Sequence, residues 1–207
     1  MIRSRRRFLQ GMVSGVGLAA TPGIAATLTP RQSAGPFYPE QLPLDNDNDL
    51  VRVGEQTQRA QGQVSDLSGR LLDRNGRAIR DTRIEIWQCD ANGRYRHSRD
   101  PGQAPIDAGF QGFGRTSSDG QGRYRFRTIR PVPYPGRTPH IHVAVFPDGD
   151  QPFVTQLYVA GEQRNASDFL YQRLSEGQQT LVTAAFLPSA GADAELAADW
   201  DIILGVG

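Results

Sequence analysis

Short stretches in which apolar and polar residues alternate follow one another along the chain from about residue 63. Many of their residues are β-branched or aromatic, and strand side chains point alternately to the two faces of a sheet, so this pattern predicts half-buried strands. The predicted strands are 63–72, 82–88, 123–129, 140–146, 153–159 and 195–203. Turn signals separate them, for example Asp-Arg-Asn-Gly at 73–76 and Ser-Asp-Gly at 118–120.

Only one window has helical character, residues 166–174, with Asn165 or Ser167 in position to cap its first turn. Many short strands, Gly/Pro-rich turns and one short helix predict an all-β fold, a two-sheet β-sandwich with long loops. We expect this single domain to span 61–207. Residues 27–60 are rich in Pro, Asp and Asn with little periodicity, and predict an extended N-terminal arm.

Residues 1–26 have the layout of an export signal rather than of a folded segment. Ser-Arg-Arg-Arg-Phe-Leu at 4–9, a weakly apolar stretch and small residues at the end resemble a twin-arginine signal. A basic arm followed by a short helix is the alternative, but the apolar stretch is shorter than the roughly 20 residues that span a bilayer. We therefore expect a periplasmic or secreted protein that lacks residues 1–26 and has no membrane span.

The charge balance excludes several classes of function. The 207 residues contain 23 basic and 22 acidic side chains, a formal net charge of +1, so no basic field indicates a nucleic-acid partner. All 23 basic residues are arginine, which excludes a Schiff-base lysine, a phosphate-loop lysine and a pyridoxal anchor. The single cysteine, Cys89, forms neither an intramolecular disulfide nor a cysteine zinc site.

Two of the three histidines lie two positions apart in the predicted strand 140–146. His140 and His142 therefore share one face of the sheet, with Cα atoms about 6.6 Å apart at a rise of ~3.3 Å per residue. Two imidazoles at this spacing are candidate ligands of one cation, whereas the alternative is two polar residues on a solvent-exposed face. His97 follows Arg96 in a charged loop, and we expect it to be solvated.

No pattern of Asp or Glu residues indicates further metal ligands beside the two histidines, but two tyrosines are candidates. Tyr134 lies between two prolines, six positions before His140, and Tyr95 follows the Asn92-Gly93 turn. A phenol has a pKa near 10, so it is ionised at neutral pH only beside a strongly Lewis-acidic cation, which favours Fe(III) over Zn(II) or Mg(II). Taken alone, each tyrosine is also explained as a packed strand residue.

Eight motifs occur in order over roughly residues 33–160, at 34–39, 84–88, 93–97, 112–116, 124–129, 133–135, 137–142 and 155–158. Together they resemble the intradiol ring-cleavage dioxygenases, with a leaning toward the protocatechuate 3,4-dioxygenase type. The chain lacks an N-terminal helical region like that of the catechol 1,2-dioxygenase type. Only Gly136 separates Tyr134-Pro135 from Arg137, where many members of the family have a longer segment, so the shape of the pocket is expected to differ there.

The resemblance implies a prealbumin-like sandwich with a non-haem Fe(III) centre that opens a catechol-type ring with O2 between its two hydroxylated carbons, giving a muconate-type diacid. The ligand positions that carry over are Tyr95, Tyr134, His140 and His142. Arg137 and Gln156 correspond to residues that line the substrate site. In the family the tyrosine at the position of Tyr134 leaves the metal when substrate binds. A sister subunit is needed in the protocatechuate type, so the resemblance leaves a homo-oligomer and assembly with a sister subunit both open for this chain.

Two non-enzymatic alternatives stay open on the sequence. One is an exported prealbumin-like binding module, which the turn and strand phrases would suit equally well. The other is an exported metal-binding protein without turnover, which would need the histidines but neither Arg137 nor Gln156. Convergence of the two tyrosines and two histidines on one point would favour the dioxygenase.

Overall fold

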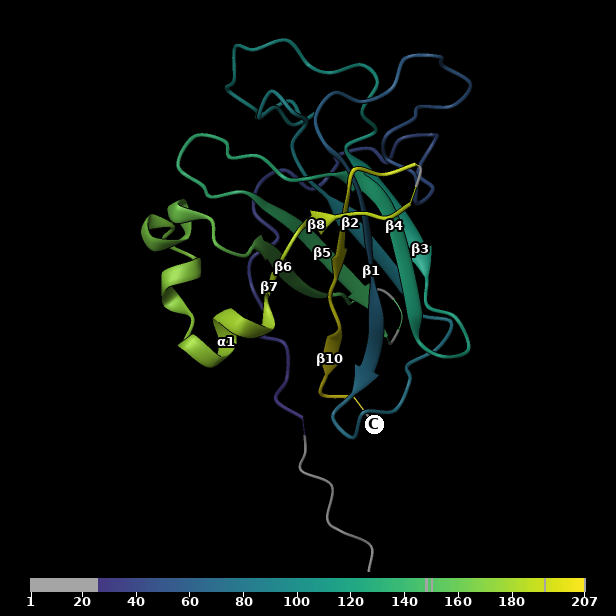
Figure 1. The fold of residues 1–207 in the computed structure, drawn as a ribbon, viewed down its shortest axis with the longest axis vertical. Coiled ribbons are helices and arrows are strands. Elements are labelled where there is room, and N and C mark those ends of the chain that lie inside the picture. Colours follow the sequence, from purple (N-terminus) through teal and green to yellow (C-terminus); the bar gives the residue numbers. More distant parts are fainter. Residues whose placement is uncertain (1–25, 148, 150, 192, 207) are drawn as a thin grey trace, which may run out of the picture.

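The computed structural model of the chain describes residues 26–147, 149, 151–191 and 193–206. The predicted export signal, 1–26, lies outside these residues except for Ala26. Two five-stranded sheets lie one behind the other, which confirms the predicted all-β sandwich (Figure 1). Among the described residues, no helix is both long and apolar enough to cross a membrane.

The first sheet is built around the long strand β1 (Val64–Asp73). Strand β4 (Arg123–Ile129) pairs antiparallel with it along one edge, while β9 (Leu196–Asp199) and β10 (Ile202–Leu204) pair parallel with it in succession along the other. Strand β8 (Leu187–Pro188) pairs with β9. The second sheet has the order β3 (Phe113–Ser117), β2 (Arg83–Trp87), β5 (His140–Phe146), β6 (Phe153–Val159) and β7 (Thr183–Ala184).

The strand predictions are largely confirmed. Three strands have the predicted bounds, 123–129, 140–146 and 153–159, and two others differ from prediction by one residue at each end. The predicted strand 195–203 is divided, because β9 pairs with the first half of β1 and β10 with its second half. At the break, Trp200 donates its backbone N–H to Ser68 and its indole N–H to Leu181. Strand β3 and the two-residue strands were not predicted.

The predicted helix at 166–174 is wrong. This part of the chain forms two 3₁₀ turns, η1 (Gln163–Ser167) and η2 (Tyr171–Arg173), and the one α-helix described, α1, follows at Glu176–Leu181. Between the turns, the carboxylate of Asp168 accepts the backbone N–H groups of Leu170 and Tyr171, which replaces a continuous helical ladder. The cap is Ser175, which forms a capping box with Gln178, rather than Asn165 or Ser167.

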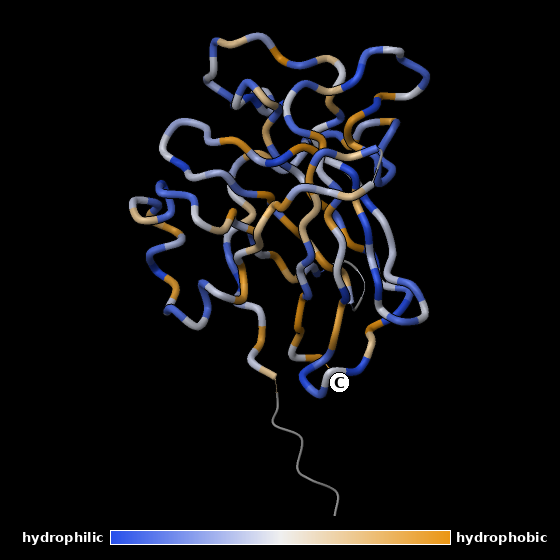
Figure 2. Tube along the Cα trace, viewed as in Figure 1, coloured by the Kyte–Doolittle hydropathy of each residue, from blue (hydrophilic) through white to orange (hydrophobic). Residues whose placement is uncertain are grey.

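Apolar residues of the facing strands fill the space between the sheets, and Figure 2 shows hydrophobic positions along the strands with polar positions in the loops. Strand β5 is buried on both faces. Ile141, Val143 and Val145 pack in the core between the sheets, so alternation places His140 and His142 on the opposite face.

The N-terminal arm covers that opposite face. Gln32 donates its backbone N–H to Val154 of β6, and Gly35 lies so close to the His142 ring that an added Cβ would sit 3.3 Å from it. His140 and His142 are 1% and 0% exposed, so the alternative of a solvent-exposed histidine pair is wrong.

Gly69 of β1 allows the backbone at Trp200, between β9 and β10, to pack closely against β1. A Cβ at Gly69 would lie 1.8 Å from the carbonyl oxygen of Trp200, which is backbone and has little freedom to move. We therefore expect Gly69→Ala to lower the free energy of unfolding by about 1–3 kcal/mol, as overpacked substitutions do. Gly120→Ala is the matched control, because nothing lies within 4 Å of a Cβ there. Thermal unfolding measures both, and equal melting temperatures for the two variants would contradict the packing described.

Candidate functional site

Three neighbouring strands of the second sheet place candidate side chains next to one another. In the strand register, His142 of β5 lies opposite Trp87 of β2 on one side and Gln156 of β6 on the other. The Trp87 and His142 rings stack with centroids 4.9 Å apart and an interplanar angle of 5°. The His142 ring is thus packed between neighbours, because it stacks on Trp87 and the arm at Gly35 lies close to its Cε1 atom.

His140 is oriented by the backbone just before its own strand. Its Nδ1 lies 2.6 Å from the carbonyl oxygen of Thr138, and because a carbonyl only accepts, Nδ1 carries the proton. The lone pair is therefore on Nε2, which lies 3.2 Å from Nε2 of His142. Orientation of one ring nitrogen by a carbonyl is the usual arrangement for a metal-binding histidine.

Both imidazoles are held in their neutral form. Burial, aided by the charge of Arg137, lowers the pKa of His140 to about 3. Burial also lowers the pKa of His142 well below its ordinary value, with smaller contributions from His140 and Arg137. Neutral imidazole is the form that binds metals.

Tyr134 enters the site from a tight turn. Arg137 donates its backbone N–H to the Tyr134 carbonyl at 3.0 Å, Pro135 and Gly136 occupy the two central positions, and Gly136 has a φ of 81°. Proline followed by a residue with positive φ is typical of a type II turn. The short segment expected to alter the pocket is thus a four-residue turn whose tip, Pro135-Gly136, is exposed.

Tyr95 is buried, with 4% exposure, and its ring stacks on Phe37 at 4.5 Å. Among the described residues its hydroxyl oxygen has no hydrogen-bond partner. Burial raises the pKa of this phenol well above its usual value of 10. A buried hydroxyl without a partner costs free energy, so this atom is suited to a ligand that the protein itself does not supply.

The rings of the four predicted ligands are neighbours in a closed cycle, which we call the circuit: Tyr95, Tyr134, His140 and His142. The centroid distances are 5.3 Å for Tyr95–Tyr134, 5.5 Å for Tyr134–His140, 4.7 Å for His140–His142 and 6.3 Å for His142–Tyr95. Within the described part of the chain, no three or more His, Cys, Asp or Glu side chains cluster as a metal site. A metal bound at the histidine pair would therefore take its further protein ligands from the tyrosines, and two imidazoles with two phenol oxygens suit a hard trivalent cation.

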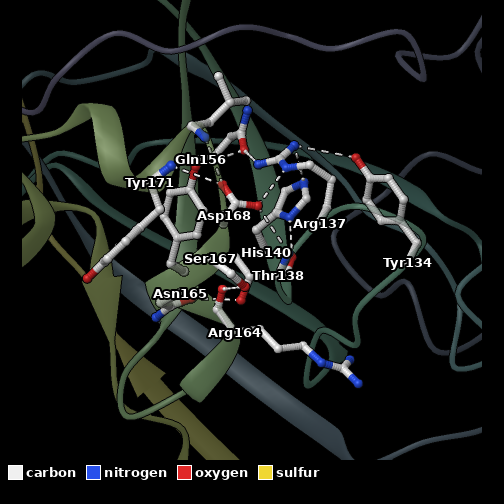
Figure 3. Close-up of polar contacts among 12 residues, drawn as sticks. Tyr134, Arg137, Thr138, His140, Gln156, Arg164, Asn165, Ser167, Asp168 and Tyr171 are labelled. Carbon is white, nitrogen blue, oxygen red and sulfur yellow. Dashed lines mark hydrogen bonds and ion pairs between the residues drawn. The ribbon is translucent and has the colours of Figure 1, made fainter.

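Arg137 lies beside Tyr134 and His140 and contacts Gln156 (Figure 3). Arg137 donates from Nη2 to Gln156 Oε1 at 2.6 Å, and its Nη1 lies 3.4 Å from both Tyr134 Oη and His140 Nε2. The Gln156 amide in turn donates to the Ser33 carbonyl of the arm at 2.9 Å. The guanidinium is thus held between a strand and the tyrosine turn.

Asp168, the residue that balances this charge, was not predicted from the sequence. Its carboxylate accepts from Arg137 Nε at 2.8 Å and from the backbone N–H of Thr138 at 3.1 Å, and the ion pair is almost wholly buried. Burial alone raises the pKa of Asp168, but the hydrogen bonds from Arg137, Tyr171 and Thr138 outweigh it and hold the pKa below its usual value. The sequence analysis placed Asp168 inside a predicted helix, whereas its role depends on contacts with Arg137 and Thr138, which are distant in the sequence.

The expectation for His97 is wrong. Its side chain is 1% exposed, its Nδ1 accepts the backbone N–H of Arg99 at 3.1 Å, and its ring packs edge-on against Phe37. Among the described residues its ring contacts Phe37 and none of the four rings of the circuit.

A cavity of about 500 Å³ opens beside the circuit. Its wall includes Tyr134 and Arg137 from the turn and Ser167 and Asp168 from the η1 region. Small-molecule sites have volumes of roughly 300–1,000 Å³, so a monocyclic compound has room beside Tyr134 and Arg137.

Comparison with known proteins assigns relatives to the chain. A family model described as "Dioxygenase" matches residues 33–206. The beta chain of protocatechuate 3,4-dioxygenase from Burkholderia cepacia is 37% identical over 188 residues, covering 84% of this chain and 78% of the relative. Hydroxyquinol 1,2-dioxygenase from Rhodococcus opacus is 32% identical over 146 residues, which are 62% of this chain and only 45% of that relative.

Solved structures agree with this match. The dioxygenase domain of a dioxygenase carbohydrate-binding protein fusion from Streptomyces sp. SirexAA-E is 28% identical, with a TM-score of 0.66, and the match covers 87% of this chain and all of that domain. An intradiol ring-cleavage dioxygenase from Tetranychus urticae has a TM-score of 0.68, covering 86% of this chain and 94% of that one; at 20% identity this likeness concerns the fold.

The buried ion pair predicts a measurable pH dependence of stability. Replacing Asp168 with Asn leaves the Arg137 charge buried and unbalanced, so the free energy of unfolding at pH 7 should fall by roughly 3 kcal/mol. The pKa of Asp168 is lower in the folded state than its unfolded value of about 3.9, so its contribution is complete above that pH and is lost as the pH falls through the folded value. Urea unfolding across this range should show the difference between wild type and variant shrinking below about pH 4.

The control is Asp119→Asn, which removes a carboxylate from an exposed ion pair with Arg123. Exposed pairs contribute little, so its effect at neutral pH should be much smaller than that of Asp168→Asn. Similar losses in the two variants, or a difference that does not depend on pH, would contradict the account of Asp168.

Proposed function

Because the chain belongs to the intradiol ring-cleavage dioxygenase family, we propose that it opens a catechol-type ring with O2 at a non-haem Fe(III) centre and releases a muconate-type diacid. The residues proposed to hold the iron are Tyr95, Tyr134, His140 and His142. When bound, Fe(III) would activate a chelated catechol toward O2. Membership of this family favours an oxidoreductase over the two non-enzymatic alternatives, the binding module and the metal-binding protein without turnover.

The observation that carries the iron proposal is the closed circuit of two imidazoles and two phenols. Burial keeps both imidazoles neutral, and the Tyr95 hydroxyl has no partner among the described residues. Burial also disfavours both phenolates, so each tyrosine needs a cation to ionise at neutral pH. A hard trivalent ion would stabilise both phenolates and would give the Tyr95 oxygen the partner that it lacks.

Within this proposal the two tyrosines have different roles. Tyr134 is half-buried, lies in a turn and forms part of the cavity wall, so its Oη is in position to accept a proton from an incoming catechol hydroxyl. Tyr95 is buried under Phe37, and its backbone N–H is held by Asp100 at 2.6 Å. We propose that Tyr134 exchanges with substrate and that Tyr95 stays in place.

Arg137 supplies a permanent positive charge beside this exchange. Its Nη1 lies 3.4 Å from Tyr134 Oη, so it favours negative charge both on that phenolate and on a catecholate that replaces it. Asp168 and Gln156 hold the other guanidinium nitrogens, which fixes the direction of Nη1. Arg137, Tyr134 and Gln156 are therefore the proposed catalytic residues.

The names of the relatives are evidence on the substrate and on subunit assembly. The matched proteins are named as alpha and beta chains of protocatechuate 3,4-dioxygenase and as hydroxyquinol and catechol 1,2-dioxygenases. These names support a catechol-type substrate and O2 for this chain. They also support a homo-oligomer or assembly with a sister subunit.

Separate phenylalanine variants test the roles of the tyrosines. Tyr134→Phe should keep most of its iron and a visible tyrosinate band from Tyr95, but lose at least about 100-fold in turnover because the proton acceptor is gone. Tyr95→Phe should weaken iron binding and change the spectrum both with and without catechol. Tyr171→Phe is the control, since its hydroxyl contacts Thr183 rather than the circuit.

The measurements are iron analysis, the visible spectrum with and without catechol, and oxygen uptake. Full turnover in Tyr134→Phe would reject its role as proton acceptor. Iron and colour that survive in the double variant Tyr95→Phe/Tyr134→Phe would reject the tyrosinate site.

We also propose that residues 1–26 are a twin-arginine export signal, that 27–60 are the arm of the mature protein and that 61–207 are the catalytic sandwich. Replacing Arg5 and Arg6 with Lys should leave the protein in the cytoplasm, because the adjacent arginine pair is what the export receptor reads. The control is Arg3→Lys, outside the pair. Fractionation of cells measures both, and unchanged periplasmic delivery of the double-lysine variant would overturn the export proposal.

A further inference from the structure

Tyr158 is a buried polar side chain next to the proposed iron site, and the proposed exchange at Tyr134 gives it no role. It lies in β6, two residues after Gln156, so both side chains are on one face of that strand. In the strand register Tyr158 is opposite His140, and the two rings have centroids 5.9 Å apart. The Tyr158 ring also packs edge-on against Tyr171 at 4.9 Å. Packing therefore fixes the ring, and hydrogen bonds determine what its hydroxyl does.

The neighbours of Gln156 determine which way its amide points. Gln156 Nε2 lies 2.9 Å from the Ser33 carbonyl oxygen, and a carbonyl only accepts, so the amide nitrogen faces the arm. The other amide atom, Oε1, accepts from Arg137 Nη2 at 2.6 Å, a contact drawn in Figure 3. It also accepts from Tyr158 Oη at 3.1 Å. Two donors thus converge on the one oxygen that holds the guanidinium.

The Tyr158 hydroxyl has a single proton, and a second partner decides where that proton points. Gln32 of the N-terminal arm places its Nε2 2.9 Å from Tyr158 Oη, and an amide nitrogen only donates. Tyr158 therefore accepts from Gln32 and keeps its own proton for Gln156. The three side chains form a chain of hydrogen bonds with one direction, from the arm to the amide that holds Arg137.

The arm segment that supplies these partners is itself bound to β6. Gln32 donates its backbone N–H to the Val154 carbonyl at 2.8 Å, and the Pro30 carbonyl accepts from the Thr155 hydroxyl at 2.9 Å. The next arm residue, Ser33, provides the carbonyl that orients the amide. The arm thus places one partner for each of the two β6 side chains.

We propose that Tyr158 is a positioning residue that, together with Gln32, fixes Gln156 and through it the direction of the Arg137 guanidinium. The inference rests on the proposed function in what it says of turnover. It adds the arm to the parts of the chain on which the reaction depends. Tyr158 acts here through its neighbours and is not itself a catalytic residue.

The physical reason is the way in which the guanidinium is held. Asp168 binds Arg137 at Nε, which lies on the axis of rotation about the Nε–Cζ bond, so this contact does not stop that rotation. The short contact of Nη2 with Gln156 does oppose it, and the same contact keeps Nη1 directed at Tyr134. Without the Tyr158 hydroxyl, the amide oxygen loses one of its two donors and holds Nη2 less firmly.

The first measurement is the rotation of the Arg137 guanidinium in the full chain, freed of metal by a chelator. Side-chain nitrogen NMR gives separate signals for Nη1 and Nη2 when rotation is slow, and their loss in Arg137→Lys identifies them. In Tyr158→Phe the exchange rate between the two signals should rise about threefold or more, as expected when a hydrogen bond is weakened. This measurement requires neither iron nor turnover.

The second measurement is oxygen uptake with catechol by the iron-loaded chain. In Tyr158→Phe, kcat/KM should fall by about tenfold, because Arg137 then favours negative charge at the Tyr134 position less strongly. The iron content should stay at the wild-type level, since the change removes none of the four proposed ligands.

Gln32→Glu tests the direction of the chain while Tyr158 is kept. A carboxylate only accepts, so it takes the Tyr158 proton that otherwise goes to Gln156. The rotation of Arg137 should therefore become faster, as in Tyr158→Phe. Gln32→Leu leaves Tyr158 free to donate to Gln156 and should have a smaller effect. Because Gln32 is only half-buried, these two variants decide the question even where Tyr158→Phe does not fold.

Tyr124→Phe is the matched control, since it removes another buried phenol hydroxyl. Tyr124 lies in β4 of the first sheet, and its hydroxyl donates to the Trp200 carbonyl. Its loss should lower the melting temperature, as that of Tyr158 does, because each removes a buried hydrogen bond. The rotation of Arg137 and kcat/KM should not change in this variant.

The outcomes separate the two proposals. An unchanged rotation of Arg137 in Gln32→Glu and in Tyr158→Phe overturns the role of Tyr158, and so does an equal increase in Tyr158→Phe and Tyr124→Phe. Faster rotation with unchanged kcat/KM overturns its importance for turnover. A wild-type chain loaded with iron that oxidises no catechol overturns the proposed function, while the rotation rates, measured without metal, still decide whether Tyr158 positions Arg137.

Discussion

Strand β5 is buried on both faces, and this constraint organises the site. One face completes the core between the sheets, and the other carries His140 and His142 beneath the N-terminal arm. Polar groups in such a position need partners, and the Thr138 carbonyl supplies one for His140. The His142 ring stacks on Trp87, but its Nδ1 has no hydrogen-bond partner among the described residues. The same burial lowers the pKa of both imidazoles and so keeps their ligating form. Burial of this strand thereby leaves two neutral imidazoles side by side, as the proposed metal site requires.

The second organising feature is the Arg137–Asp168 pair, which joins the tyrosine turn to the η1 region. A buried guanidinium is tolerated because Asp168 balances it and Gln156 accepts from it. Its remaining nitrogen is then directed at Tyr134 and His140. Stability and the proposed chemistry therefore depend on one network of hydrogen bonds.

The parts of this arrangement that depend on local periodicity could be predicted from the sequence. Alternation in 140–146 placed both histidines on one face, and the prolines around Tyr134 indicated a fixed segment. Convergence of Tyr95 with the histidines followed only from the resemblance to a family, because residues far apart in sequence meet only in the fold. Asp168 and the divided strand at Trp200 were missed for the same reason: contacts with distant segments override the local helix and strand preferences. His97 was misjudged because Phe37, from the arm, helps to bury it.

The most direct test of the account is the metal environment of the wild-type protein as purified, measured by resonance Raman scattering together with iron-edge X-ray absorption. The account predicts about one iron per chain, phenolate vibrations enhanced by excitation in the visible band, and a first shell containing two imidazole nitrogens. Tyrosine vibrations that are not enhanced, or a chain filled with zinc or copper in place of iron, would contradict the claim that the two tyrosines and two histidines form one ferric site.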